Sequence, residues 1–415
     1  MLKSFKLLTL NWRRLSLACL GLILSLSLAC TQSGPQPDSA AQPPAAAAPT
    51  ETADTPADIP VASAPLPPET QAIVDNVGPE SLVNPPRGDV RLVVISDLNG
   101  PYGSIDYDPE IDTAITLLPF WQPDMVVCSG DMVAGQDLTL TEQRMREMWA
   151  GFDQHVGARL RDMGIPYGFT VGNHDASGAR GVGGTFLFQK ERDIAEEYWR
   201  DPAHDPGIEF VDRNDFPFYY TFERDGIFFL AWDGSSDTIP PENLAWVEQA
   251  LGSPAAQQAK MRILLGHLPL YPVAEGRNTP AEVMSNADQL QAMLEKYDVH
   301  TYISGHHHAY YPAHRGNLQL LHTGVLGAGP RPLIDSSLPP AKALTIVDIS
   351  FDTPSLTAYT TYNMQTLQVI EMQTLPRILV GHNGMVLRRD IDWEDLAADE
   401  KALCEQRLGA EKCLS

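Results

Sequence analysis

Short apolar runs alternate with longer amphipathic stretches along most of the chain, starting near residue 91. Six runs have the length of strands, and several are rich in β-branched or aromatic residues: 92–95, 125–128, 167–171, 227–232, 261–265 and 299–303. Stretches with helical spacing lie between them, around 109–120, 139–163, 186–200, 241–251 and 280–297. Short buried strands that alternate with helices predict a layered α/β fold.

The C-terminal part of the chain has a different pattern. Three further strand-like runs follow one another at 343–349, 356–362 and 367–372, with no helical stretch between them. Consecutive strands of this kind predict an antiparallel meander. We therefore place one folded domain at 87–375 and a C-terminal extension at 376–415.

The first thirty residues have the layout of a secretory signal. Four basic residues and no acidic one come first, and the apolar run Leu15–Ala29 follows. Leu26–Cys30 resembles a bacterial lipobox, in which Cys30 would be the lipidated first residue of the mature chain. This predicts an exported periplasmic or cell-envelope lipoprotein, held at the membrane by its N-terminal lipid. An uncleaved anchor helix is the alternative, and it also places the rest of the chain outside the cytoplasm.

Residues 31–86 are expected to tether the domain to that anchor. The segment Thr31–Pro68 has 38 residues, of which 10 are Pro and 10 are Ala, and it contains no basic residue. Such a composition buries too little apolar surface to offset the entropy cost of ordering. Its prolines favour an extended, semi-stiff spacer. Residues 69–86 form a transition to the folded domain.

Composition and charge exclude several classes of protein. Hydrophobic residues make up 43% of the 415 and charged residues 20%, which excludes wholesale disorder, collagen and multi-span membrane proteins. The net charge of −24 argues against general nucleic-acid binding, because phosphate backbones are held by Lys and Arg. An anionic substrate would need strong local positive charge, which bound metal cations can supply.

Cysteines are few. Cys404 and Cys413 lie near the C-terminus and could close a small loop in an oxidising compartment. No Cys-x-x-Cys pair occurs, so a structural zinc site or a thioredoxin-like centre is not indicated.

Polar and imidazole side chains follow five of the apolar runs directly. Ligand sites in α/β sheets form beyond the carboxyl ends of strands, so we expect these segments to meet. Taken singly, each has an ordinary structural explanation as a turn or a helix cap, but the ordered set predicts a metal or catalytic site. The five segments are Ser96-Asp97-Leu98-Asn99, Ser129-Gly130-Asp131-Met132, Gly172-Asn173-His174-Asp175, Gly266-His267 and Gly305-His306-His307-His308. Four contain Gly, which we expect to permit the tight turns.

In this order the segments resemble the motifs of the calcineurin-like metallophosphoesterase superfamily. The resemblance spans about residues 90–325, and Leu268-Pro269-Leu270-Tyr271 after His267 is similar to the purple acid phosphatase branch. It implies a fold of two facing β-sheets wrapped by helices. It also implies hydrolysis of phosphomonoesters or phosphodiesters, through attack by a hydroxide that bridges two metal ions, which would be Fe, Mn or Zn.

The resemblance also implies a role for each motif residue. The first ion would be held by Asp97, Asn99, Asp131 and His308, and the second by Asp131, Asn173, His267 and His306. His174 would be a general acid or would stabilise phosphoryl charge, and His307 should point away from the metals. Asp175 would orient His174, or it is an ordinary acid at a helix N-terminus.

The chain departs from the family pattern in its first motif. Asn99 stands where the family has His, and the Tyr that purple acid phosphatases supply instead is replaced by Ala134. Asn99 could coordinate through its amide oxygen, and Tyr102 is a second candidate. Arg180 and Arg277, on glycine-containing loops, either grip a substrate phosphate or are solvated loop charges.

Three functions stay open from the sequence. The first is a binuclear metal-dependent phosphoesterase acting on a small-molecule phosphoester. The second is a non-catalytic metal- or phosphate-binding envelope lipoprotein, because the first-motif His is missing. The third is an envelope tether whose C-terminal strands bind a partner. The segments 176–217 and 271–280 are expected to build the pocket for the leaving group.

Overall fold

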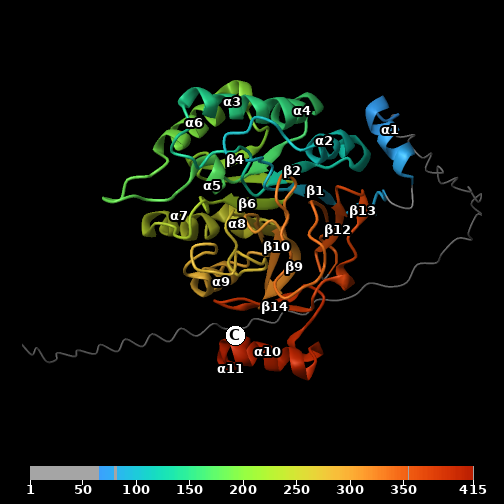
Figure 1. Ribbon diagram of the computed structural model, residues 1–415, viewed down its shortest axis with the longest axis vertical. Coiled ribbons are helices and arrows are strands. Elements are labelled where there is room, and N and C mark those ends of the chain that lie inside the picture. The colour runs from blue at the N-terminus through green and yellow to red at the C-terminus, as the bar shows by residue number, and fades with distance from the viewer. Residues whose placement is uncertain (1–64, 79–81, 354, 415) are drawn as a thin grey trace, which may run out of the picture. The chain divides into compact units, whose positions relative to one another are not determined.

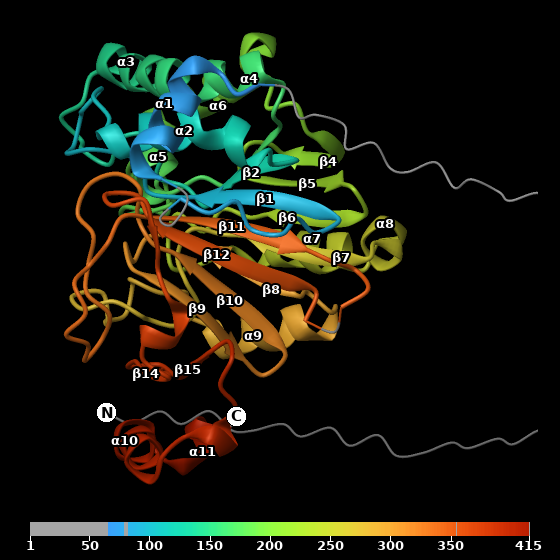
Figure 2. The same cartoon turned by 90° about the vertical axis from the view of Figure 1, so that its right-hand side faces the viewer.

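The computed structural model describes residues 65–78, 82–353 and 355–414 (Figures 1 and 2). The predicted signal peptide, the lipobox with Cys30 and the spacer as far as residue 64 lie outside this part of the chain. The lipid anchor, its alternative and the exported location therefore stay predictions. Among the described residues, no helix combines the length and the apolar character needed to cross a membrane.

Two β-sheets form the centre of the fold. The smaller sheet has the order β13-β12-β11-β1-β2-β3 and the larger one the order β14-β15-β9-β10-β8-β7-β6-β5-β4. The strands of the smaller sheet are β1 (Val90–Ile95), β2 (Met125–Cys128), β3 (Tyr167–Phe169), β11 (Ala343–Ile349), β12 (Thr357–Asn363) and β13 (Gln368–Val369). Those of the larger sheet are β4 (Glu209–Asp215), β5 (Tyr219–Arg224), β6 (Ile227–Ala231), β7 (Met261–Leu265), β8 (Thr301–Ser304), β9 (Tyr310–Arg315), β10 (Leu318–Thr323), β14 (Ile378–Val380) and β15 (Met385–Arg388).

Helices flank both sheets, which confirms the predicted α/β architecture. Figure 2 shows α2, α3, α4 and α6 on the side of the smaller sheet, and α9 beside the larger one. The helices are α1 (Pro68–Val77), α2 (Pro109–Trp121), α3 (Glu142–Phe152), α4 (Ala158–Met163), α5 (Asn173–Ala176), α6 (Gln189–Arg200), α7 (Pro241–Leu251), α8 (Pro254–Gln258), α9 (Ala287–Lys296), α10 (Ala398–Leu408) and α11 (Ala410–Leu414).

Parallel pairing aligns the strand ends that carry the motifs. β1 pairs with β2, and β2 with β3, all in parallel, so Ile95, Cys128 and Phe169 lie in register. In the larger sheet β6, β7 and β8 are also parallel, with Leu265 beside Ile303. Parallel strands place their carboxyl ends at one edge of a sheet. The segments that follow these strands therefore emerge on the same side of the molecule.

Strand β1 is buried at all six positions, including the charged Arg91. The guanidinium of Arg91 binds Asp348 on β11 through two contacts of 2.8 and 3.1 Å, and it donates to the carbonyl of Trp121 at 2.9 Å. A buried charge is tolerated only when it is paired and its donors are satisfied. This network ties β1 to its neighbour strand and to the end of α2.

Several elements differ from the sequence predictions. The predicted helix at 139–163 is two helices, separated by a π-helical stretch at Asp153–Gly157. Helix α9 begins at 287 rather than 280, because residues 278–286 form a loop. Helix α1 lies in the stretch assigned to the transition, and Thr70 on it donates to the carbonyl of Thr116 on α2.

The predicted C-terminal meander is confirmed, since β11, β12 and β13 pair antiparallel in sequence order. The strands β4, β5, β9, β10, β14 and β15 were not among the predicted strands. The last two lie in the predicted extension, and β15 pairs with β9 of the larger sheet. Part of the extension thus completes a sheet of the domain.

The disulfide that the sequence left open is formed between Cys404 on α10 and Cys413 on α11. Both cysteines belong to a small separate core with residues of β14 and β15, namely Ile378, Val380, Met385 and Leu387. Cys128 stays a free, buried thiol.

We predict that replacing both Cys404 and Cys413 by Ser loosens this C-terminal core and leaves the central sheets intact. Closing so short a loop contributes about 2–3 kcal/mol by restricting the unfolded chain. Hydrogen–deuterium exchange should accelerate in α10 and α11 and stay unchanged in β1 and β2. Equal exchange in both proteins would show that the disulfide does not hold the two helices.

Candidate metal centre

The five motif segments meet at the carboxyl ends of β1, β2, β3, β7 and β8. Backbone hydrogen bonds join them directly: the amide of Asp97 donates to the carbonyl of Gly130 at 2.9 Å, and the amide of Gly305 donates to that of His267 at 3.0 Å. The amide of His174 donates to Asp131 Oδ1 at 2.8 Å, which ties the third segment to the second. The sequence prediction that these segments meet is therefore confirmed.

Four of the motif residues adopt backbone conformations that side chains of L-residues rarely take. Asp97, Asp131, His306 and His308 have φ angles of 51°, 55°, 64° and 54°. Each left-handed non-glycine residue costs on the order of 1–3 kcal/mol and persists where the surrounding structure enforces it. Here the strained residues follow the strand ends and carry the side chains of the site.

At two of the motif glycines, side chains of neighbouring segments come too close for a Cβ atom to fit. A Cβ atom on Gly172 would overlap the carboxylate of Asp131, and one on Gly305 would overlap the side chains of Ser96 and Asp97. Only Gly130 among these three has a positive φ, of 98°. The expected reason, a tight turn, applies to Gly130, whereas Gly172 and Gly305 are needed because no side chain fits.

A first cluster of potential ligands joins two carboxylates and one imidazole. Ligand atoms of Asp97, Asp131 and His308 all lie within 4.8 Å of one another. His308 Nε2 is 3.3 Å from Asp97 Oδ1, and its Nδ1 donates to the carbonyl of Gly329 at 3.0 Å. One nitrogen of the ring is thereby fixed and the other is turned toward the carboxylates.

A second cluster lies beside the first and shares Asp131 with it. The amide oxygen of Asn173 is 2.9 Å from His267 Nε2 and 2.9 Å from His306 Nδ1. His267 Nε2 is 3.3 Å from Asp131 Oδ2. The amide oxygen of Asn173 thus contacts both imidazoles, and His267 links this group to the carboxylate of Asp131.

Each side chain of the second cluster is oriented by a partner outside it. His267 Nδ1 donates to the carbonyl of Ser129 at 2.8 Å, and the amide nitrogen of Asn173 donates to Gln136 at 2.7 Å. His306 Nε2 lies 2.8 Å from Glu282, which also binds Arg277 at 2.5 Å. Such outer contacts select which atom a metal-binding side chain presents. Glu282 and Gln136 carry no sequence signal for this role.

The two buried carboxylates favour positive charge in the centre. Burial raises the pKa of Asp131, but His267 and His174 lower it further, so that it lies well below its usual range. Burial likewise raises the pKa of Asp97, and His308 lowers it below its usual value. Conversely, burial lowers the pKa of His267, but Asp131 raises it to about 9. The same negative charge that holds this proton can hold metal cations.

Asn99 stays a candidate oxygen ligand. Its amide oxygen is buried and has no hydrogen-bond partner, and its backbone amide lies 3.3 Å from the carbonyl of Asp131. An unpaired buried oxygen costs free energy unless a ligand satisfies it. Tyr102, the other candidate, is 63% exposed, and its ring lies 5.1 Å from that of His174.

The donor set fits metal ions of the iron, manganese and zinc type. Carboxylate, amide and imidazole ligands suit these ions, and the first cluster has more oxygen donors than the second. The unpaired oxygen of Asn99 is the clearest mark of this fit within the described residues.

His174 lies at the edge of the two clusters. Its Nδ1 donates to the carbonyl of Gly135 at 2.9 Å, and its Nε2 faces Asp131 Oδ2 at 3.9 Å. The ring is half-buried and lies close to the clusters without being part of either. The sequence analysis expects such a position for a general acid that is not a metal ligand. His307 turns away, as predicted, and lies 2.9 Å from the carbonyl of Glu282.

The expected role of Asp175 in orienting His174 has to be corrected. Its carboxylate accepts hydrogen bonds from the backbone amides of Met132, Val133 and Gly172, at 2.7, 2.9 and 2.8 Å. Burial, with a contribution from Asp131, raises its pKa to about 7. Asp175 therefore fixes the loop around Asp131, and within the described residues it makes no hydrogen bond to the His174 ring.

The two arginines singled out in the sequence also have defined partners. Arg277 is paired with Glu282 and lies 3.4 Å from His306 Nε2. Arg180 lies farther along the chain from the third motif and donates to the carbonyl of Gly184 at 2.6 Å.

Comparison with known proteins places this arrangement in a family. A model described as calcineurin-like phosphoesterase matches residues 90–310, a segment that contains all five motif segments. No curated protein matches the chain.

Two of the solved structures that are similar to this chain are the following. A purple acid phosphatase from yellow lupin (Lupinus luteus) seeds aligns at 18% identity over 69% of this chain and 54% of its own, with a TM-score of 0.47. GAP50, described as the anchor in the inner membrane complex of Plasmodium, aligns at 14% identity over 68% of this chain and 87% of its own, with a TM-score of 0.42. This chain thus spans about half the length of the lupin protein.

At these identities neither structure bears on activity, and the family assignment rests on the matched model. That model covers more than half of the 415 residues. The chain belongs to the calcineurin-like phosphoesterase family.

Proposed function

We propose that this protein is a binuclear metal-dependent phosphoesterase that hydrolyses phosphomonoesters or phosphodiesters. The observation that supports it most is the position of Asp131, whose carboxylate takes part in both ligand clusters. A carboxylate has two oxygens and can bridge two cations. The first ion would be held by Asp97, Asn99, Asp131 and His308, and the second by Asp131, Asn173, His267 and His306.

Two such ions would supply positive charge for the phosphoryl oxygens and would lower the pKa of a coordinated water from 15.7 towards ~7. Two divalent cations against the carboxylates of Asp97 and Asp131 leave a local charge of about +2. This local positive charge would allow a chain of net charge −24 to bind an anionic phosphoester.

His174 is the residue that can move a proton to the leaving group. Its Nδ1 donates to the carbonyl of Gly135, so the second proton of the charged ring sits on Nε2. That nitrogen faces the shared carboxylate of Asp131. A proton held there can pass to the oxygen of the departing alcohol.

The non-catalytic alternative rests on the absence of the first-motif His at position 99. Asn99 keeps a buried oxygen at this position, and the second cluster is complete. These observations favour catalysis over simple binding.

A comparison of His174→Ala with Asp131→Ala tests the proposal. We expect His174→Ala to keep its metal content and to lose ~10²–10⁴-fold in turnover of an aryl phosphate, as loss of general acid help would cause. Asp131→Ala should lose both the metal and the activity, because it removes the bridge. Elemental analysis of each purified protein is the second readout. If Asp131→Ala kept wild-type metal content and rate, the binuclear proposal would be wrong.

Metal binding should release protons. Because the pKa of His267 in the metal-free protein is about 9, its ring is charged at neutral pH and has to lose a proton before Nε2 can bind a cation. Affinity should therefore rise with pH by up to ~tenfold per unit below about 9 and level off above it. Calorimetric titration with Mn²⁺ in two buffers of different ionisation enthalpy measures the protons released. Affinity that is independent of pH would contradict the role of His267.

Asn99→His should tighten the first site. The change replaces an amide oxygen by an imidazole, which binds zinc-like ions more strongly. In the wild type we expect a chelator to remove the two ions in two steps, with the first site losing its ion at the lower chelator concentration. In Asn99→His the two chelator concentrations should lie closer together. Tyr102→Phe is the matched control and should change neither step. If Tyr102→Phe, and not Asn99→His, alters the first step, Tyr102 is the ligand.

A further inference from the structure

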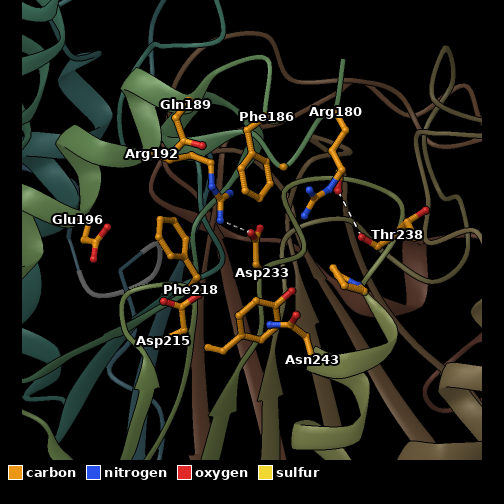
Figure 3. Close-up of a pocket in the computed structure, with 14 residues that line it drawn as sticks. Arg180, Phe186, Gln189, Arg192, Glu196, Asp215, Phe218, Asp233, Thr238 and Asn243 are labelled. Atoms are coloured by element: carbon orange, nitrogen blue, oxygen red, sulfur yellow. Dashed lines mark hydrogen bonds and ion pairs between the residues drawn. The ribbon is translucent and has the colours of Figure 1, made fainter. Parts of the chain in front are cut away.

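A polar pocket is lined in part by the loop that follows α5, the short helix that carries Asn173 and His174. Its volume is about 310 Å³, within the lower range of small-molecule sites. Figure 3 shows side chains of the loop after α5, of α6, of the strand ends near β5 and β6 and of the start of α7 turned toward one cavity. The segment 176–217, expected from the sequence to shape the leaving-group pocket, contributes about half of its wall.

One wall of the pocket is a rigid stack of alternating arginine and phenylalanine side chains. The guanidinium carbons of Arg180 and Arg192 lie 4.2 and 4.1 Å from the ring centre of Phe186, and Arg192 also lies 3.9 Å from that of Phe218. Arg192 is buried and forms an ion pair of 2.8 Å with Asp233 (Figure 3). The buried contact of Arg192 with Phe218 and its buried ion pair with Asp233 hold the inner part of this wall, whereas Arg180 at its outer end is exposed.

The same wall holds the helix that carries His174. Arg192 donates to the carbonyl of Ala176, the last residue of α5, at 2.7 Å. Ser235 donates to that carbonyl at 3.2 Å and accepts from the amide of Gly178, a pocket residue, at 2.8 Å. Gly178 is four residues from His174, which limits their separation to about 14 Å even in extended chain. The pocket is therefore tied to the third motif by a short stretch of chain and by the bonds of Arg192 and Ser235.

The charges of the pocket select against a second anion. Two arginines and three carboxylates line it, which gives a formal net charge of −1. Arg192 is neutralised by Asp233, and Glu196 binds Arg200 at 2.6 Å outside the pocket. Arg180 and Asp215 then remain as opposite charges, so the pocket offers a second anion no net attraction.

The remaining lining favours hydroxyl groups. Amide and hydroxyl side chains supply both hydrogen-bond donors and acceptors, and these are Gln189, Tyr219, Ser236, Thr238 and Asn243. A hydroxyl group is itself both a donor and an acceptor, so it can pair with the amide of Asn243 and the hydroxyl of Tyr219, which an apolar group cannot do.

We propose that this pocket binds the leaving group of the phosphoester and that it takes a neutral group rich in hydroxyls, such as a sugar or another polyol. The inference rests on the proposed phosphoesterase function and names the substrate class of that site. The metal centre holds the phosphoryl group, and the pocket holds the alcohol that departs with the proton of His174.

The first test compares glucose monophosphate with para-nitrophenyl phosphate in the metal-loaded wild type and in Asn243→Ala. We expect the ratio of their kcat/KM values to fall about fivefold to tenfold in Asn243→Ala, through KM for the sugar phosphate, as loss of one hydrogen-bonding amide would cause. Asn317→Ala, on the exposed turn between β9 and β10, is the control and should leave the ratio unchanged. An unchanged ratio in Asn243→Ala would overturn the proposal.

The second test reverses the charge of the pocket. Asp215 is exposed, so Asp215→Lys should fold, and the formal charge becomes +1. The wild type should prefer glucose monophosphate to fructose bisphosphate, and Asp215→Lys should raise the relative kcat/KM of the bisphosphate several-fold. A wild type that prefers the bisphosphate would contradict the charge argument.

A binding measurement separates this inference from the proposed function. Saturation-transfer NMR from the metal-free protein to methyl glucoside should give a signal that Asn243→Ala weakens. If no phosphoester is hydrolysed but this signal is present, the proposed function is wrong and the pocket assignment stands. If para-nitrophenyl phosphate is hydrolysed and no signal is found, the pocket assignment is wrong and the phosphoesterase stands.

Discussion

The buried carboxylate of Asp131 is the constraint on which the site depends. It follows β2, in a left-handed backbone conformation, and takes part in two clusters of ligands. Gly172 passes so close to it that no side chain fits there, Asp175 fixes the loop around it, and the amide of His174 donates to it. A buried negative charge needs a compensating cation, and His267, whose pKa Asp131 raises, carries that positive charge until a metal replaces its proton.

The order of the strands explains why residues so far apart in the sequence reach this carboxylate. Two parallel sets, one in each sheet, deliver five segments to one side of the molecule. The ligand clusters take residues from both sheets, so neither sheet alone carries a complete site. The polar pocket likewise combines residues from the two sides of the fold. Arg192 lies on α6, on the side of the smaller sheet, and Asp233 follows β6 of the larger sheet (Figure 2).

The sequence predicted the parts of this arrangement that leave a strong local signal. The strand β2 is an unbroken apolar run, β1 and β7 are apolar apart from one arginine each, and the motif residues follow all three directly. Outer partners such as Glu282 and Gln136 could not be found, because each acts through a contact made only in the folded chain and sits in a loop of ordinary composition. The orienting role expected for Asp175 was wrong, since its neighbour in sequence, His174, is not its partner in space, whereas the alternative, an acid at a helix N-terminus, is confirmed. The short strands β14 and β15 depend on pairing, β15 with β9 and β14 with β15, rather than on their own pattern.

The most direct test of the central claim is a crystal structure of the metal-loaded protein with inorganic phosphate, with the ions located by anomalous scattering. We predict two ions on either side of the Asp131 carboxylate, one bound also by Asp97 and His308 and the other by Asn173, His267 and His306, with phosphate on both. A single ion, or two ions that do not share Asp131, would contradict it.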